Sequence, residues 1–147
     1  MSAAMADSRA PLVLVVLSSA FERVHYALAT AAAAAAADRP AILFFTQGAV
    51  RAIAGTHDAP GWRRLTVDDP SLGGSDARTL DRAFRARGAA GIEELFAACR
   101  ELHVTFLVCS MGLRVAEIAR SELREDLGVE ETGLVDVLSR GGDLAYV

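Results

Sequence analysis

Cys109 is the residue whose type and position point most directly to chemistry. It follows the apolar run Val104 to Val108 and precedes a segment with helical character. Unpaired backbone N–H groups at the start of a helix stabilise an anion, so a cysteine placed there favours the nucleophilic thiolate form. Ser110 and the backbone N–H groups that follow, including that of Met111, would stabilise this anion. The alternative is that Cys109 is a small buried apolar residue with no chemical role, as free cysteines commonly are.

The other nucleophilic or metal-binding side chains give weaker signals. Cys99 falls on the apolar face of the segment Ile92 to Leu102, which predicts a packed core thiol. The two cysteines have neither the CxxC spacing of a redox pair nor the spacing of a zinc site, and they are too few for a disulfide scaffold. His25, His57 and His103 are scattered along the chain. We therefore expect no metal centre and no cofactor, and a reducing compartment.

Hydrophobic patterning predicts the elements that position these side chains. Continuous apolar runs rich in branched and aromatic residues are typical of parallel strands buried on both faces. Four strands are predicted: Leu12 to Leu17, Ala41 to Phe45, Val104 to Val108 and Leu144 to Val147. Five helical segments are predicted around them: Phe21 to Ala37, Asp76 to Arg87, Ile92 to Leu102, Met111 to about Leu127 and Gly133 to Arg140. The fourth could be broken into shorter helices.

Local signals predict where some of these helices begin and end. Ser19 and Glu22 have the spacing of a capping box, which predicts that the first helix begins there. Thr132 is expected to cap the last helix, and Gly141–Gly142 to end it. The segment Gly55 to Ser75 contains two prolines and four glycines and is predicted to be a long functional or mobile loop.

The alternation of strands and helices predicts the α/β class, as a single-domain three-layer sandwich around a mainly parallel sheet of about five strands. The domain is expected to span residues 11–147, after a disordered tail over residues 1–10. Ligand sites in such sheets lie beyond the carboxyl ends of the strands. The predicted pocket therefore draws on the residues that follow the first three strands: Ser18, Ser19, Gln47, Gly48, Cys109, Ser110 and Met111.

Composition excludes several classes of function. The chain has 147 residues and a formal charge of -4, and all 15 of its basic residues are arginine. Without lysine it has no Schiff-base chemistry, no pyridoxal phosphate attachment and no Walker A motif. The acidity argues against nucleic acid as a partner. The longest apolar run, Ala31 to Ala37, is too short for a membrane span, and the N-terminus lacks a signal pattern, so we expect a cytoplasmic protein.

The sequence leaves the roles of two surface features open. Arg63, Arg64 and Arg78 could bind an anion or an acidic patch of a partner, although solvated surface charge is the commoner explanation. Trp62 follows Pro60 and could serve as loop packing or as an interface anchor.

Three stretches of the chain together resemble the DsrE/DsrF-like family, which includes the TusD-type sulfur-relay subunits. They are LVLVVLSSAFERVHYALATAAAAAAADRPAILFFTQGAV, GIEELFAACRELHVTFLVCSMGLRV and TGLVDVLSRGGDLAYV. The first is a strand–helix–strand unit, the second places a cysteine after a short strand, and the third is a terminal helix and strand. The resemblance implies a small α/β sandwich that assembles as a homo-trimer or hexamer, with persulfide carried on the cysteine that Cys109 matches.

The leading functional hypothesis is therefore a sulfur carrier or sulfurtransferase-like protein. The Cys109 thiolate would accept a sulfur atom from a donor protein and pass it to an acceptor protein, by thiol exchange that needs no cofactor. The alternative is a non-catalytic oligomeric module of the same fold that binds a small ligand or a protein, with an inert Cys109. A peroxide-reducing thiol enzyme is a third option, but it needs a resolving thiol, and Cys99 is expected to face the core.

Overall fold

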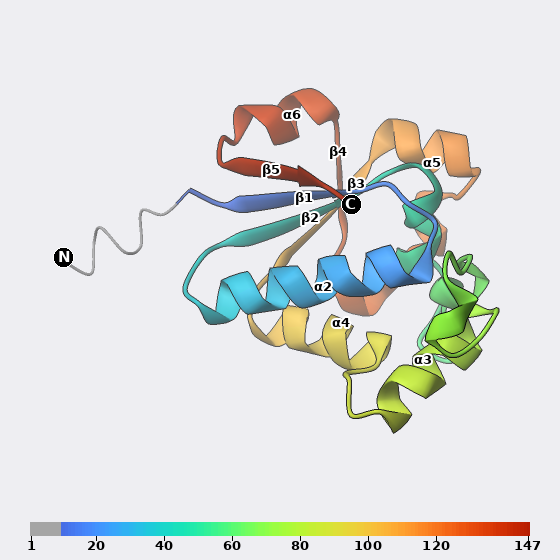
Figure 1. Cartoon of the computed structure of the whole chain (residues 1–147). Coiled ribbons are helices and arrows are strands. Elements are labelled where there is room, and N and C mark those ends of the chain that lie inside the picture. The colour runs from blue at the N-terminus through green and yellow to red at the C-terminus, as the bar shows by residue number, and fades with distance from the viewer. Residues whose placement is uncertain (1–9) are drawn as a thin grey trace.

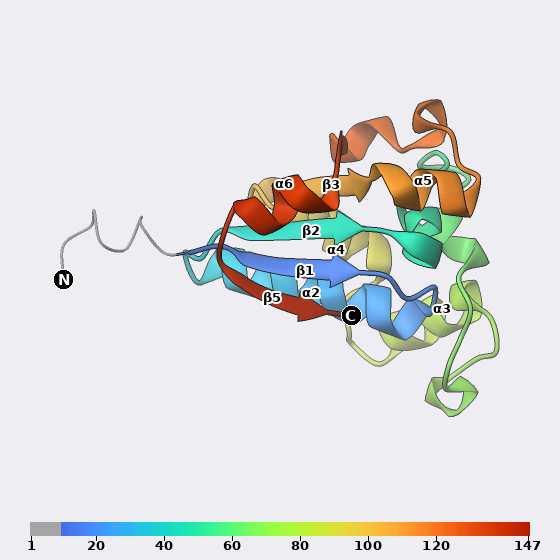
Figure 2. The same ribbon diagram turned by 90° about the horizontal axis from the view of Figure 1, so that it is seen from above.

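Five parallel strands form the centre of the protein in the computed structural model, which describes residues 10–147. They are β1 (Leu12–Val16), β2 (Ala41–Phe45), β3 (Thr105–Cys109), β4 (Glu130–Thr132) and β5 (Asp143–Tyr146). Their order across the sheet is β4-β3-β2-β1-β5 (Figures 1 and 2). The predicted α/β sandwich with a parallel sheet is therefore confirmed. Residues 1–9 of the predicted tail lie outside the described part of the chain.

Side chains along the central strands alternate between two apolar clusters, one on each face of the sheet. The larger cluster receives Leu14, Val16, Leu43, Phe45, Phe106 and Val108. The smaller cluster receives Val13, Val15, Ile42, Phe44, Leu107 and Cys109. Because both faces of these strands are covered, their sequences are continuous hydrophobic runs rather than alternating ones.

Helices α2 (Phe21–Ala36) and α4 (Ile92–Glu101) lie side by side on the face with the larger cluster (Figure 1). The alanine-rich second half of α2 has small side chains and high helix propensity, so this helix can lie close to the sheet. The buried face of α4 includes Phe96 and Cys99, as its apolar periodicity predicts. Most of the hydrophobic core therefore lies between this helical layer and the sheet.

The opposite face of the sheet is covered by one short helix, α6 (Leu134–Ser139) (Figure 1). Val137 is its one buried residue, and it belongs to the smaller apolar cluster. Leu134 and Leu138 are partly exposed, and Val135 is 84% exposed. This layer of the sandwich is therefore thin and is held to the sheet mainly through one side chain.

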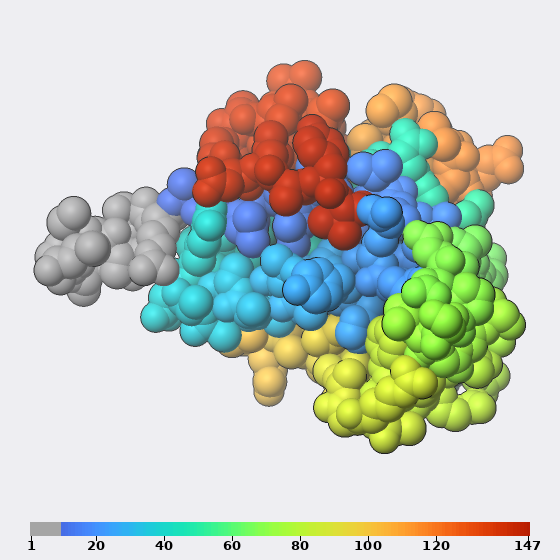
Figure 3. Space-filling view, in the orientation of Figure 1, coloured from blue at the N-terminus to red at the C-terminus, as the bar shows by residue number. Residues whose placement is uncertain are grey.

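Helices α3 (Ala77–Ala86) and α5 (Ser110–Ala116) lie toward the carboxyl end of the sheet (Figure 1). The segment predicted as a long loop leads to α3, and in Figure 3 the two form one continuous mass beside α2. This segment contains the short 3₁₀ helices Gly61–Arg64 and Pro70–Leu72. Trp62 is buried, with its ring 5.9 Å from that of Phe21. Trp62 therefore serves as internal packing for this segment.

The predicted capping box at the start of the first helix is wrong. Helix α2 begins after Ala20, whose side chain makes no capping hydrogen bond. The carboxylate of Glu22 instead accepts hydrogen bonds from the backbone N–H groups of Asp68 and Asp69, at 3.2 and 2.7 Å. Glu22 thus anchors the distant loop segment rather than the start of its own helix.

Two further boundaries differ from the sequence prediction. The helical segment predicted from Met111 to about Leu127, with a possible break, is interrupted after Ala116, because Glu117 adopts a left-handed conformation with φ of 55° and two 3₁₀ turns follow. Thr132 does not cap α6, since it is the last residue of β4 and Gly133 occupies the capping position.

Candidate functional site

Cys109 ends β3 and directly precedes α5, so the predicted strand-to-helix junction is confirmed. Its side chain belongs to the smaller apolar cluster, together with Phe44, Leu107 and Val137. Only 3% of the residue is exposed. Cys109 is therefore a free thiol at the carboxyl edge of the sheet that is covered on the side of α6.

The loops that follow β1 and β2 touch each other and α5 at this edge. A Cβ atom on Gly48 would lie 2.8 Å from the Cβ of Ser19, so the close approach of these loops requires glycine. A Cβ atom on Gly112 in α5 would lie 2.9 Å from the Cα of Thr46. Gln47 lies between these contacts and has a positive φ of 51°. The fold thus brings Ser19, Gln47 and Gly48 against the elements that follow the first three strands.

Ser18 lies on a different part of the same edge. It lines a shallow hollow of about 610 Å³ whose walls include Ser19, Tyr146 and Val147. The backbone N–H of Ser18 donates to the carbonyl of Val147 at 3.3 Å, which joins the end of β1 to the end of β5. Cys109 is not among the residues that line this hollow.

The two residues after Cys109 have separate roles in the structure. The hydroxyl of Ser110 donates to the carbonyl oxygen of Thr132 at 3.4 Å and so connects α5 to β4. Met111 is 48% exposed at the surface of α5. Neither residue reaches the hollow beside Ser18.

Cys99 is fully buried in α4, as its position on the apolar face predicts. Its Sγ atom donates to the carbonyl oxygen of Leu28 at 3.4 Å. Burial raises the pKa of the Cys99 thiol to about 12, because the thiolate would lose its hydration in the core. Cys99 is therefore a neutral structural thiol at neutral pH.

The raised pKa of Cys99 predicts a loss of stability at alkaline pH. In the unfolded chain the thiol releases its proton near its ordinary value of 9.0, whereas the folded protein retains the proton up to about 12. Between these values unfolding releases a proton, so the free energy of unfolding should fall by up to about 1.4 kcal/mol per pH unit. Urea titrations at about pH 8 and about pH 10 should show this decline in the wild type and a smaller one in Cys99→Ala. Equal declines in the two proteins would contradict the assignment.

The three histidines make their contacts in other parts of the fold. His25 lies in the helical layer on the opposite face, with Nε2 2.8 Å from the carbonyl oxygen of Ala90. His57 is exposed, and its Nδ1 is 3.6 Å from a carboxylate oxygen of Glu93. His103 follows the end of α4, at a positive φ of 60°. None of these contacts involves Cys109, so the junction thiol has no histidine partner within residues 10–147.

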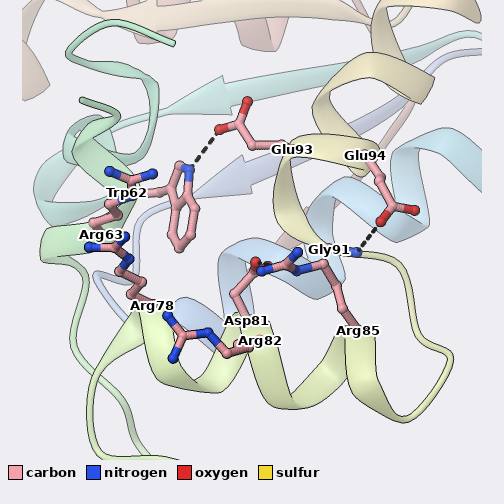
Figure 4. A pocket seen from close by; sticks show the side chains of 9 residues that line it. All are labelled: Trp62, Arg63, Arg78, Asp81, Arg82, Arg85, Gly91, Glu93 and Glu94. Atoms are coloured by element: carbon pink, nitrogen blue, oxygen red, sulfur yellow. Dashed lines mark hydrogen bonds and ion pairs between the residues drawn. The ribbon is translucent and has the colours of Figure 1, made fainter. Parts of the chain in front are cut away.

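A buried ion-pair network around Arg124 was not predicted from the sequence. The Arg124 side chain is 1% exposed, and its Nη1 and Nη2 atoms donate to the carboxylate of Glu93 at 2.7 and 2.9 Å. It also donates to the carboxylate of Asp126 from Nε at 3.0 Å and from Nη2 at 2.7 Å. The indole Nε1 of Trp62 donates to Glu93 at 2.7 Å (Figure 4). These contacts join the Trp62 segment, α4 and the turn after α5.

The network stabilises the charged forms of Arg124 and Asp126. Burial opposes the positive charge of Arg124, but its hydrogen bonds to Asp126 and Glu93 outweigh burial and raise its pKa. The same hydrogen bonds from Arg124 hold the pKa of Asp126 below its ordinary value. Glu93 and Arg124 are 31 positions apart in the sequence, so no local spacing signals their pairing.

Residues 10–147 contain neither a metal-binding cluster nor a membrane-spanning helix. In this part of the chain, no group of three or more His, Cys, Asp or Glu side chains is arranged to hold a metal ion. No helix there combines the length and the apolar character that a bilayer crossing requires.

Comparison with known proteins finds no family model and no curated protein that matches the chain. The resemblance to the DsrE/DsrF-like family therefore rests on the three sequence stretches quoted above. Because a fold alone does not determine an activity, the position and the surroundings of the chain's own residues are what bear on its function.

Proposed function

We propose that the chain is a sulfur carrier that holds a persulfide on Cys109 and passes the sulfur atom to a partner protein. The observation that carries the proposal is the position of Cys109 at the β3–α5 junction, where the carboxyl ends of the parallel strands meet. The other thiol does not compete, because Cys99 is fully buried and its pKa is raised to about 12. The resemblance to sulfur-relay proteins points to the same residue.

The proposed transfer is a pair of thiol exchanges without net oxidation. The Cys109 thiolate attacks the terminal sulfur of a donor persulfide, R–S–SH. A bond forms between Cys109 Sγ and that sulfur, the S–S bond of the donor breaks, and the donor leaves as the thiolate R–S⁻. The thiolate of an acceptor protein then attacks the terminal sulfur of Cys109–S–SH, which returns Cys109 to its thiolate form.

Access to Cys109 requires that α6 move away from the sheet. The thiol lies in the apolar cluster beneath this helix, and Val137 is the one buried side chain that α6 contributes to the cluster. Opening such a short, weakly packed element is a local event that leaves the larger core on the other face intact. We therefore propose that α6 acts as the cover of the sulfur-carrying residue.

Incubation of the wild-type protein with glutathione persulfide tests the function directly. Intact-mass spectrometry should show one added sulfur atom, and peptide mapping should place it on the peptide that contains Cys109. A protein that takes up no sulfur in the folded state would contradict the sulfur-carrier proposal.

Replacing Val137 by alanine tests the role of α6. Loss of two buried methyl groups weakens the closed state by about 1.5 kcal/mol, so the open fraction and the native-state alkylation rate of Cys109 should rise about tenfold. Val135→Ala is the matched control, because it makes the same change on the same helix at a residue that is 84% exposed. Alkylation with iodoacetamide followed by peptide mapping measures both rates. Equal rates in the two variants would mean that α6 does not control access.

A second candidate function is a non-catalytic binding module of the same fold. The 3% exposure of Cys109 and its apolar surroundings favour this function, since an inert thiol is stable in such a place. Self-association remains a proposal for either function. It is supported by the exposed apolar side chains of α6 and β5, including Val135 and Tyr146, which are 84% and 65% exposed. Sulfur uptake by the folded protein distinguishes the carrier from the binding module.

A further inference from the structure

Four arginine side chains surround a pocket of about 330 Å³ between the 3₁₀ helix Gly61–Arg64, α3 and the start of α4 (Figure 4). Arg78, Arg82 and Arg85 come from one face of α3, where the spacing of four and three residues places them in a row. Arg63 comes from the segment before α3. Two separate elements of the fold thus direct positive charge to the same hollow.

The carboxylates in this pocket are already engaged by other groups. Asp81 is 5% exposed and accepts hydrogen bonds from the backbone N–H of Ile92 at 2.7 Å and from Arg85 at 3.2 Å. Glu93 is held by the side chains of Trp62 and Arg124, as described above. Glu94, the third carboxylate that lines the pocket, accepts a hydrogen bond from the backbone N–H of Gly91 at 3.4 Å.

The remaining three arginines have no carboxylate partner among residues 10–147. Arg63 donates to the backbone carbonyl of Asp58, at 3.3 Å, and lies over the ring of Trp62 at 5.8 Å from its centre. Arg82 acts on Asp76 through charge alone, without a hydrogen bond between them. Figure 4 shows the guanidinium groups of Arg63, Arg78 and Arg82 on one side of Trp62, away from Glu93. The pocket therefore presents three guanidinium groups that form no ion pair within residues 10–147, in a protein whose net charge is -4.

The wall behind these arginines is tightly packed. Trp62 is 4% exposed, and its indole N–H is fixed by Glu93. A Cβ atom on Gly61 would lie 2.1 Å from the carbonyl oxygen of Arg51, so the backbone at the base of Arg63 is packed against the preceding 3₁₀ helix. When a ligand binds to groups carried on such a wall, less of the backbone has to become ordered, so the entropy cost of binding is smaller.

We propose that this pocket binds the phosphate group of a small molecule. A guanidinium presents a planar fork of N–H donors that matches two phosphate oxygens, and several such groups around one hollow suit a compact anion with more than one negative charge. The volume lies at the lower end of the range for small-molecule sites. A concave pocket on an acidic protein fits a small ligand better than a nucleic acid duplex or a membrane, both of which need a broad basic surface. The site lies in the helical layer opposite α6 and does not depend on the chemistry of Cys109.

Isothermal titration calorimetry at constant ionic strength tests this site with inorganic phosphate and pyrophosphate as probes. The wild type should bind pyrophosphate saturably at one site. Each of Arg78→Gln and Arg82→Gln should weaken binding about tenfold, and the double variant about a hundredfold, since each removes a charge-assisted hydrogen bond. Both side chains are exposed, so the variants should fold, and circular dichroism checks this.

Arg64→Gln is the matched control, because Arg64 neighbours Arg63 on the same 3₁₀ helix but does not line the pocket. Its affinity for pyrophosphate should stay within about twofold of the wild type. An equal loss in this control, or no binding of either probe to the wild type, would overturn the proposal. Tighter binding of a single-stranded DNA oligonucleotide, or of vesicles that contain phosphatidylserine, would also overturn it and assign the arginines to a macromolecular surface.

Discussion

Cys109→Ser is expected to take up no sulfur under conditions in which the wild type gains one sulfur atom from glutathione persulfide. A hydroxyl is far less acidic than a thiol, so serine supplies no nucleophile at neutral pH for attack on a persulfide. The substitution changes one atom at a residue of the smaller apolar cluster, so the fold should persist with a modest loss of stability. Intact-mass spectrometry measures the adduct, and circular dichroism checks the fold.

Cys99→Ser provides the matched control for this experiment. It makes the same chemical change at a thiol that is fully buried, and whose pKa is raised to about 12. This variant should keep the sulfur adduct, although the buried hydroxyl should lower its stability. If Cys109→Ser kept the adduct, or if only Cys99→Ser lost it, the sulfur would be carried on a residue other than Cys109. Either result would contradict the proposed mechanism.

The central strands could be predicted from the sequence because burial on both faces leaves a strong local signal. β1, β2 and β3 are continuous apolar runs, and the structure places them side by side in the middle of the sheet. The edge strand β4 was missed because its three residues, Glu130 to Thr132, are polar and mostly exposed. An edge strand with one neighbour carries no continuous hydrophobic run, so its pairing with β3 appears only in the fold.

The candidate site was predictable in part for the same reason. The end of an apolar run followed by small residues placed Cys109 at a strand-to-helix junction. Its cover could not be predicted, because α6 reaches the sheet only after the chain has passed through β4. The capping box failed in a related way, since Glu22 is taken by backbone groups 46 and 47 positions away. Sequence spacing describes local competition for hydrogen bonds and says nothing about distant partners.

The buried Arg124 network makes an asymmetric prediction about stability. Arg124 is 1% exposed, whereas its partners Glu93 and Asp126 are 33% and 52% exposed. Removing both carboxylate charges, in Glu93→Gln with Asp126→Asn, leaves a buried cation without a counter-charge. The free energy of unfolding should fall by about 3 kcal/mol, because an uncompensated buried charge cannot regain its hydration.

Arg124→Met should cost less, about 1 kcal/mol, although it breaks the same ion pairs. Methionine keeps the apolar part of the packing against Phe96, over whose ring the guanidinium lies at 5.1 Å, and the carboxylates left behind can be hydrated. Adding Arg124→Met to the double carboxylate variant should therefore restore more than half of the lost stability. Urea denaturation at neutral pH measures all three proteins, with Arg120→Met as a control at an exposed arginine. If the triple variant is less stable than the double variant, removing the unpaired charge of Arg124 has not restored stability. The loss in the double variant would then come from broken hydrogen bonds or packing rather than from the buried charge.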